Sequence, residues 1–157
     1  MTAAKDKWTE QEAGLDCYLC PPRLSAHPGI ILVACLSASS LFLQRDQRFR
    51  GHCCLILAEH VTRLDALPEK TYFAFMQDLR RSVSAIREAA NPDHMNIALL
   101  GNSCPHLHWS IVPRSRRDSR WGRPVWEDSI LLEMKNNPAV LTDAEYGDLI
   151  GNIRKHF

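Results

Sequence analysis

The sequence has no apolar run that approaches the roughly 20 residues of a membrane-spanning helix. Its opening, Met1 to Glu12, lacks the charged and apolar blocks of a signal peptide. A large excess of charge is absent too, since 19 Lys and Arg residues face 18 Asp and Glu residues. These absences predict a cytoplasmic protein with no membrane partner. They also argue against the broad basic surface that duplex nucleic acid requires, whereas small anions need only a few well-aimed donors.

Internal repeats and breaks in composition are also missing from the 157 residues. A chain of this length buries a core without help from disulfides, so one domain spanning residues 1–157 is predicted. Within it, residues 1–14 are expected to form a loose N-terminal arm or a short helix. Residues 114–157 are expected to form a C-terminal tail that ends in a helix.

Short apolar runs predict five strands, at residues 30–36, 41–43, 53–58, 95–100 and 107–112. Apolar residues such as Phe73 and Leu79 recur at threes and fours and predict a long helix over residues 68–90, with Asp78 on its solvent side. A capping box, Thr142-Asp-Ala-Glu145, opens a terminal helix. This order, without alternation of strand and helix, predicts an α+β fold: a mainly antiparallel five-stranded sheet with the helices on one face.

The six cysteines are not typical of a disulfide scaffold. Four lie in apolar runs and are predicted to be core thiols: Cys35, Cys53, Cys54 and Cys104. Cys17 and Cys20 form a Cys-x-x-Cys pair with three possible roles: zinc ligands, a redox pair or unliganded thiols. A redox pair is expected at the start of a helix that follows a strand, whereas two prolines follow this pair at once and no strand precedes it. Zinc is therefore the favoured interpretation.

The segment Gly101 to Arg114 carries the strongest chemical signal. Because side chains alternate along a strand, His106, His108 and Ser110 share one face, and the apolar residues between them share the other. A single histidine on a strand is usually structural, but two at this spacing beside a hydroxyl favour a functional site. Imidazole is a neutral nucleophile at pH 7 and can carry a covalent phosphoryl intermediate.

Three stretches of the chain, in order, resemble the histidine-triad (HIT) family. The segment His106-Leu-His-Trp-Ser-Ile-Val-Pro-Arg114 is similar to its His-φ-His-φ-His-φ-φ motif, where φ is an apolar residue, with Ser110 in the third histidine position. Gly51-His52 followed by His60 resembles a second family stretch, although Ala58 lies near the usual proline position. The Cys-x-x-Cys pair resembles the N-terminal pair of the family, and Trp121 to Trp126 is similar to the tail of bacterial members.

The resemblance implies a catalytic group in which His108 attacks the nucleotide α-phosphate, with Ser110 and His52 beside it. A serine hydroxyl donates one hydrogen bond but carries no positive charge. Losing a charge-assisted contact costs about 1.5–3 kcal/mol, or roughly ten- to a hundredfold in rate.

The resemblance also implies a substrate-binding group. Asn102 stands where the family commonly has glutamine, and Ser103 follows it, so both are expected to contact phosphate. Gln44 stands seven residues before Gly51, where relatives often carry an acidic residue that binds the ribose. Asn96 is a further candidate, for which a core or turn role is an equal alternative.

Family members with the Cys-x-x-Cys pair bind zinc through residues at these positions. The resemblance therefore implies a structural Cys2His2 zinc site, here Cys17, Cys20, His60 and His106. In that interpretation His106 is a metal ligand rather than a base. The family also implies a homodimer, for which exposed sheet edges are suited.

Three functions follow as hypotheses. The first is a nucleotidyl hydrolase or transferase that acts on a dinucleoside polyphosphate or nucleoside phosphoramidate. The second is a nucleotide-binding or sensing module with little turnover, because Ser110 replaces the third histidine. The third is a nucleic-acid binder, suggested by the arginines of residues 114–123 but opposed by the balanced net charge.

Overall fold

The computed structural model describes residues 3–127 and 135–157, within which the predicted α+β fold is confirmed. Its principal elements are, in order, α1 (Ala3–Glu12), β1 (Ile30–Cys35), β2 (Ser39–Gln44), β3 (Cys53–Leu57), α2 (Glu69–Ala90), β4 (His94–Ala98), β5 (His108–Arg114) and α4 (Asp143–Arg154). The opening segment, expected as a loose arm or a short helix, forms α1. None of the helices in the described ranges is long and apolar enough to cross a membrane.

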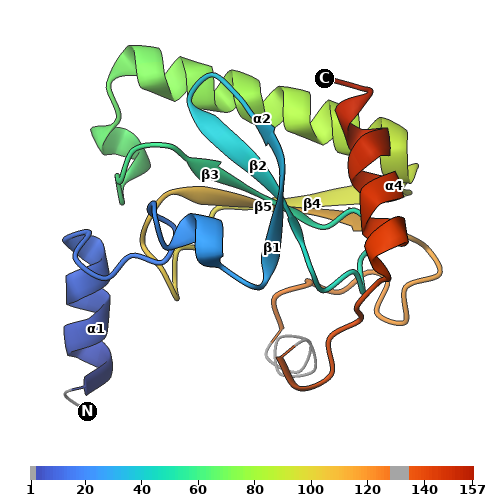
Figure 1. Cartoon of the computed structure of the whole chain (residues 1–157), viewed down its shortest axis with the longest axis horizontal. Coiled ribbons are helices and arrows are strands. Elements are labelled where there is room, and N and C mark those ends of the chain that lie inside the picture. The colour runs from blue at the N-terminus through green and yellow to red at the C-terminus, as the bar shows by residue number, and fades with distance from the viewer. Residues whose placement is uncertain (1–2, 128–134) are drawn as a thin grey trace.

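The strands form one antiparallel sheet in the order β1-β2-β3-β5-β4, with β1 and β4 at its edges. Helices α2 and α4 pack against the sheet, while α1 lies apart from them, at the opposite side of the molecule from the C-terminus (Figure 1). The capping box predicted for the last helix is present, since Thr142 and Glu145 exchange hydrogen bonds. The register places His108 of β5 opposite Ile56 and Ser110 opposite Cys54 of β3.

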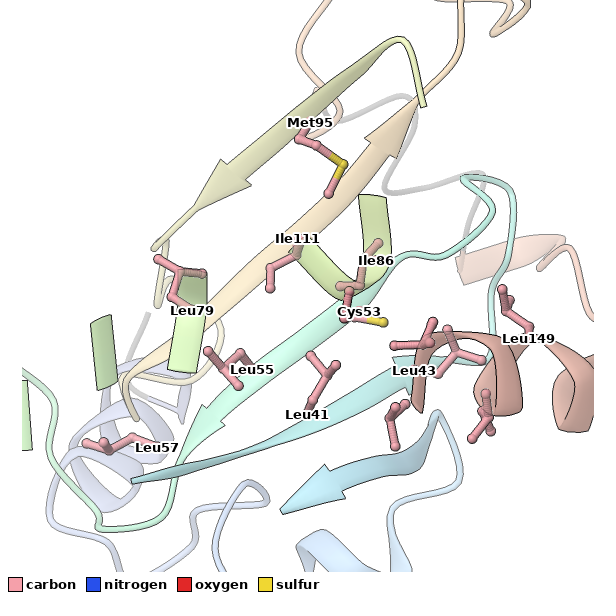
Figure 2. Close-up of a cluster of buried hydrophobic side chains, with 14 of the residues drawn as sticks. Leu41, Leu43, Cys53, Leu55, Leu57, Leu79, Ile86, Met95, Ile111 and Leu149 are labelled. Carbon is pink, nitrogen blue, oxygen red and sulfur yellow. The ribbon is translucent and has the colours of Figure 1, made fainter. Parts of the chain in front are cut away.

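The main core fills the space between one face of the sheet and the two helices. Figure 2 shows Leu41, Leu55 and Ile111 of the strands meeting Ile86 of α2, with Leu149 of α4 at one end. A smaller apolar cluster lies on the other face of the sheet, where the alternate residues of β2 and β3 point. It includes Cys17, Leu19, Phe42, Cys54, Ile56 and Cys104. The N-terminal segment therefore covers part of the sheet face that the helices leave open.

Two residues of α2 and one cysteine differ from expectation. Phe73 is 60% exposed, whereas Asp78 is fully buried. The helix turns Phe75, Leu79 and Ile86 toward the core and brings Asp78 under the β1–β2 connection. There its carboxylate accepts four hydrogen bonds of 2.7–3.3 Å, from the amides of Ser37 and Ala38 and the hydroxyls of Ser37 and Ser39. Cys35, predicted as a core thiol, is exposed because it ends an edge strand.

Candidate active site

Strand β5 alternates as predicted. Leu107, just before the strand, and Ile111 are buried in the main core, and Trp109 packs against it with its ring 6.4 Å from that of Phe75. The intervening His108 and Ser110 are half-buried. The apolar residues anchor the strand to the helices, so the polar ones are held on a rigid element.

The imidazole of His108 is oriented by a backbone hydrogen bond. Its Nδ1 atom lies 2.7 Å from the carbonyl oxygen of His106. A carbonyl oxygen only accepts, so Nδ1 carries the hydrogen and Nε2 of the neutral ring presents its lone pair. This is the tautomer that a nucleophilic Nε2 requires.

His108 lines a cavity of about 250 Å³ on the open sheet face. Gln44, the predicted ribose contact, lines the same cavity. The other lining residues are Tyr18, Leu19, His27, Ile30, Cys54 and Ile56. We call this space the His108 cavity. It combines an apolar floor with a few polar groups, as small-molecule sites do.

His52 and Ser110 form a pair beside the nucleophile. The Nε2 atom of His52 lies 3.1 Å from the Oγ atom of Ser110. Burial lowers the pKa of His52 to about 4, so its ring is neutral at pH 7. Its Nδ1 atom is buried without a hydrogen-bond partner among the described residues. An unpaired acceptor is tolerated better than an unpaired N–H, so Nε2 of His52 carries the hydrogen and donates it to Ser110.

The remaining candidate substrate contacts lie outside the His108 cavity. The Oδ1 atom of Asn96 accepts a 2.8 Å hydrogen bond from Nη1 of the buried Arg114. Asn96 thus helps to hold Arg114, which also binds the carbonyls of Arg120 and Arg123. Asn102 and Ser103 are exposed in the turn before β5, and Asn102 lines a separate pocket against α1.

Tyr18 and His27 are cavity residues that the sequence argument missed. Their rings lie 5.6 Å apart, and both line the His108 cavity. A usable signal was the position of Tyr18 and Leu19 between the two paired cysteines. If both cysteines bind one ion, the two residues between them are held close to His60, which follows β3, and His106, which precedes β5.

The four predicted metal ligands converge. Their ligand atoms all lie within 4.8 Å of one another. The Sγ atoms of Cys17 and Cys20 are each 3.4 Å from Nδ1 of His106, and Nδ1 of His60 lies 3.3 Å from Sγ of Cys20 and 3.3 Å from Nδ1 of His106. Tetrahedral zinc with ordinary bond lengths needs separations of about 3.6 Å between sulfur and nitrogen and about 3.3 Å between two nitrogens. This donor set fits zinc.

The surroundings of these ligands also suit a metal. The Nε2 atoms of His106 and His60 donate to the carbonyl oxygens of Leu57 (2.8 Å) and Glu12 (3.1 Å), leaving both Nδ1 atoms as ligands. Burial lowers the pKa of His106 to about 4, which favours the neutral ring that binds a metal. Gly14 adopts φ +76°, and a Cβ atom there would lie 3.3 Å from the His60 ring.

Comparison with known proteins matches residues 32–117 to the HIT domain family. A solved histidine triad protein from Bradyrhizobium japonicum is 26% identical with a TM-score of 0.73, covering 86% of this chain and 94% of its own. A hypothetical histidine triad nucleotide-binding protein from Sulfolobus tokodaii is 17% identical (TM-score 0.61, 89% of both chains). A Zn-bound histidine triad family protein from Mycobacterium smegmatis is 21% identical (TM-score 0.58, 85% of this chain and 87% of its own).

Proposed function

This chain belongs to the HIT family, and on that basis we propose that it binds a nucleotide in the His108 cavity and cleaves it at the α-phosphate. The observation that carries the proposal is the 2.7 Å hydrogen bond from Nδ1 of His108 to the His106 carbonyl, in a cavity shared with Gln44. It leaves Nε2 as the nucleophile, beside an amide able to bind a ribose diol. The nucleotide-binding description of the Sulfolobus tokodaii neighbour agrees with this assignment.

The reaction is a double displacement. The lone pair of Nε2 attacks the α-phosphorus, and the bond from phosphorus to the leaving group breaks with its electron pair on that group, which takes up a proton. The result is a nucleotidyl-histidine on His108. Water, or a second substrate in a transferase, then displaces the imidazole and releases the nucleoside monophosphate or its transfer product.

Ser110 and His52 act together on the phosphate. Because Nε2–H of His52 donates to Ser110, the serine hydroxyl keeps its own hydrogen for a phosphate oxygen. That contact is neutral, so it stabilises developing negative charge less than a charged histidine would. The phosphate contacts proposed for Asn102 and Ser103 require the turn before β5 to close over the substrate, whereas Asn96 acts by holding Arg114.

The zinc that we propose for Cys17, Cys20, His60 and His106 is structural. All four positions are occupied by protein ligands, so the ion has no open site for substrate. It would attach the N-terminal segment to His106, whose backbone carbonyl orients His108. The Zn-bound neighbour from Mycobacterium smegmatis agrees with zinc as the ion.

The alternative is a nucleotide-binding module with little turnover, which the neutral Ser110 favours. The deciding experiment incubates the protein with a panel of adenosine 5′-phosphoramidates and dinucleoside polyphosphates. Mass spectrometry then looks for a nucleotidyl adduct on His108. The enzyme is supported if His108→Ala loses both turnover and the adduct. The control is His156→Ala, at an exposed histidine, which should retain both.

Thermal stabilisation by AMP without adduct or product supports the binding module. In that case Ser110→His is expected to introduce turnover. If wild type and His108→Ala hydrolyse every substrate equally poorly and AMP does not bind, both assignments are wrong.

A further inference from the structure

The connection between β2 and β3 contains a buried glutamine that the reaction above does not use. Gln47 is 6% exposed, although it lies in a loop between two strand ends. Strand β2 ends at Gln44, which lines the His108 cavity. His52, which pairs with Ser110, immediately precedes β3. The loop therefore joins the proposed ribose contact to the proposed phosphate contact.

Gln44 and His52 lie opposite each other where the β2–β3 ladder meets this loop. Leu43 and Cys53 form the last pair of the ladder. The amide of Gln44 continues it by donating to the carbonyl of His52 at 3.0 Å. Opposite residues of antiparallel strands project from the same face, with Cβ atoms about 4.5–5.5 Å apart. The two side chains are thus neighbours on the face of the sheet that carries His108.

The Gln47 side chain takes the place of one hydrogen bond of this pair. In a regular hydrogen-bonded pair, the N–H of His52 would donate to the carbonyl of Gln44. Here that N–H donates to the carbonyl of Phe49 at 2.9 Å. The Nε2 atom of Gln47 donates to the Gln44 carbonyl instead, at 2.6 Å. It also donates to the His52 carbonyl at 3.3 Å, so one amide group holds both strand ends.

The amide of Gln47 is oriented and anchored by its surroundings. Its Oε1 atom accepts from the N–H of Gly51 at 2.8 Å, so Nε2 faces the two carbonyls, which only accept. Gly51 is closely packed, because a Cβ atom there would lie 3.2 Å from both Ala90 and Pro113. The backbone N–H of Gln47 donates to the carbonyl of Ala139 at 2.8 Å, which ties the loop to the chain before α4.

We propose that Gln47 is a positioning residue that sets the spacing between the ribose contact and the phosphate contact of one nucleotide. This inference rests on the proposed function. Gln47 is not among the residues that line the His108 cavity, so it acts through the strand ends that carry Gln44 and His52. A nucleotide in the cavity is then held at its ribose while its α-phosphorus meets Nε2 of His108.

The spacing matters because a ribose diol and an α-phosphate are joined by a short covalent path. Contacts to both assist each other only when their separation matches that path, and a misplacement of about 1 Å is enough to lose much of the effect. Without the Gln47 amide, the Gln44 carbonyl and the Gly51 N–H both lose a partner in a buried loop. Such groups rearrange to find new partners, which moves the strand end that carries Gln44.

The test uses adenosine 5′-phosphoramidate and its 2′,3′-dideoxy analogue, which lacks the diol. The measured quantity is the ratio of their kcat/KM values, ribose over dideoxyribose. Partial unfolding lowers both values equally and leaves the ratio unchanged. Wild type is expected to prefer the ribose form roughly tenfold, the scale of one or two neutral hydrogen bonds. In Gln47→Met, which keeps the length of the side chain but not its amide, the preference is expected to fall to about twofold or less.

A double-mutant cycle separates positioning from a general loss of activity. Gln44→Ala removes the ribose contact itself and is expected to lower the ratio as far as Gln47→Met does. In the Gln44→Ala background, Gln47→Met is expected to leave the ratio unchanged, because the contact that it positions is already gone. The matched control is Gln77→Met, at an exposed glutamine of α2, where the ratio is expected to stay within about twofold of wild type.

A second variant covers the case in which Gln47→Met does not fold. Gln47→Glu keeps an acceptor for the Gly51 N–H, but its ionised carboxylate has no hydrogen to donate to the two carbonyls. The same fall in the ratio is expected.

The inference is overturned, and the proposed function stands, if the ratio in the Gln47 variants equals that of wild type. A further fall in the double variant, an equal fall in Gln77→Met, or a wild type without preference for the ribose form has the same consequence. If wild type binds nucleotides without turnover, calorimetry with AMP and its 2′,3′-dideoxy analogue gives the ratio as a ratio of affinities, with the same outcomes. If wild type neither cleaves nor binds these compounds, the proposed function and the inference are both wrong.

Discussion

The buried His52 makes a pH-dependent contribution to stability that can be calculated. Its pKa is about 4 in the folded protein and 6.5 in an ordinary exposed setting, because burial penalises the charged ring. Between these two pH values the unfolded chain holds a proton on this residue and the folded chain does not. Falling pH therefore favours unfolding, so the stability is present above pH 6.5 and is lost as pH falls toward 4.

The difference of 2.5 between the two pKa values corresponds to roughly 3 kcal/mol at about 1.36 kcal/mol per pH unit. The substitution His52→Gln removes the titration and keeps an amide that can donate to Ser110. We expect the free energy of unfolding of wild type to decrease by roughly 3 kcal/mol relative to His52→Gln between pH 6.5 and 4, with no further change in the difference above pH 7.

Urea unfolding at half-unit pH intervals measures both curves, with zinc at the same saturating concentration throughout. Contributions from the other histidines are common to both proteins and cancel in the difference. His156→Gln, at an exposed residue, is the control and should run parallel to wild type. Parallel curves for wild type and His52→Gln would show that His52 titrates normally and that the neutral His52–Ser110 pair is wrong.

Three further outcomes are expected. Asp78→Ala removes the acceptor of four hydrogen bonds and should destabilise the fold by about 3 kcal/mol or more in urea unfolding, whereas Asp143→Ala, at an exposed residue, should cost less. Chelating the metal should weaken AMP binding in calorimetry, because Tyr18 and Leu19, which lie between two ligands, line the His108 cavity. The Sγ atom of Cys104 lies 3.7 Å from that of the proposed ligand Cys17, so Cys104→Ala should weaken zinc binding roughly tenfold in chelator competition. An unchanged zinc affinity would mean that Cys104 is a core thiol only.

The homodimer expected from the family resemblance stays a prediction. Strands β1 and β4 lie at the two edges of the sheet, and an oligomeric-state measurement in solution is the direct test.

Local pattern explains why much of β5 was predictable. The two-residue alternation of a strand is a property of the backbone, so His108 and Ser110 had to share a face opposite Leu107 and Ile111. The same reasoning located the long helix but not the width of its buried face. A 3.6-residue period leaves flanking positions such as Phe73 and Asp78 undecided, and the neighbouring β1–β2 connection selected Asp78 for burial.

The family resemblance predicted the four metal ligands but not the neighbouring contacts that shape the site. The order of Cys17, Cys20, His60 and His106 along the chain matched a family with a known ligand set. The carbonyl of His106 that orients His108, and the cavity wall formed by Tyr18 and His27, could not be located by that match. Each depends on where distant segments pack, because contacts between residues far apart in sequence are made only when the chain folds.

The sequence by itself determined the α+β class and the nucleophile candidate on an alternating strand, because these depend on residue type and on local periodicity. The four candidate metal ligands came from the resemblance of its motifs to those of the family. The tertiary structure alone decided which ring nitrogen of His108 is free and that His52 is buried against Ser110. Those features arise from packing between distant segments, which sets burial and hydrogen-bond partners and which no local pattern encodes.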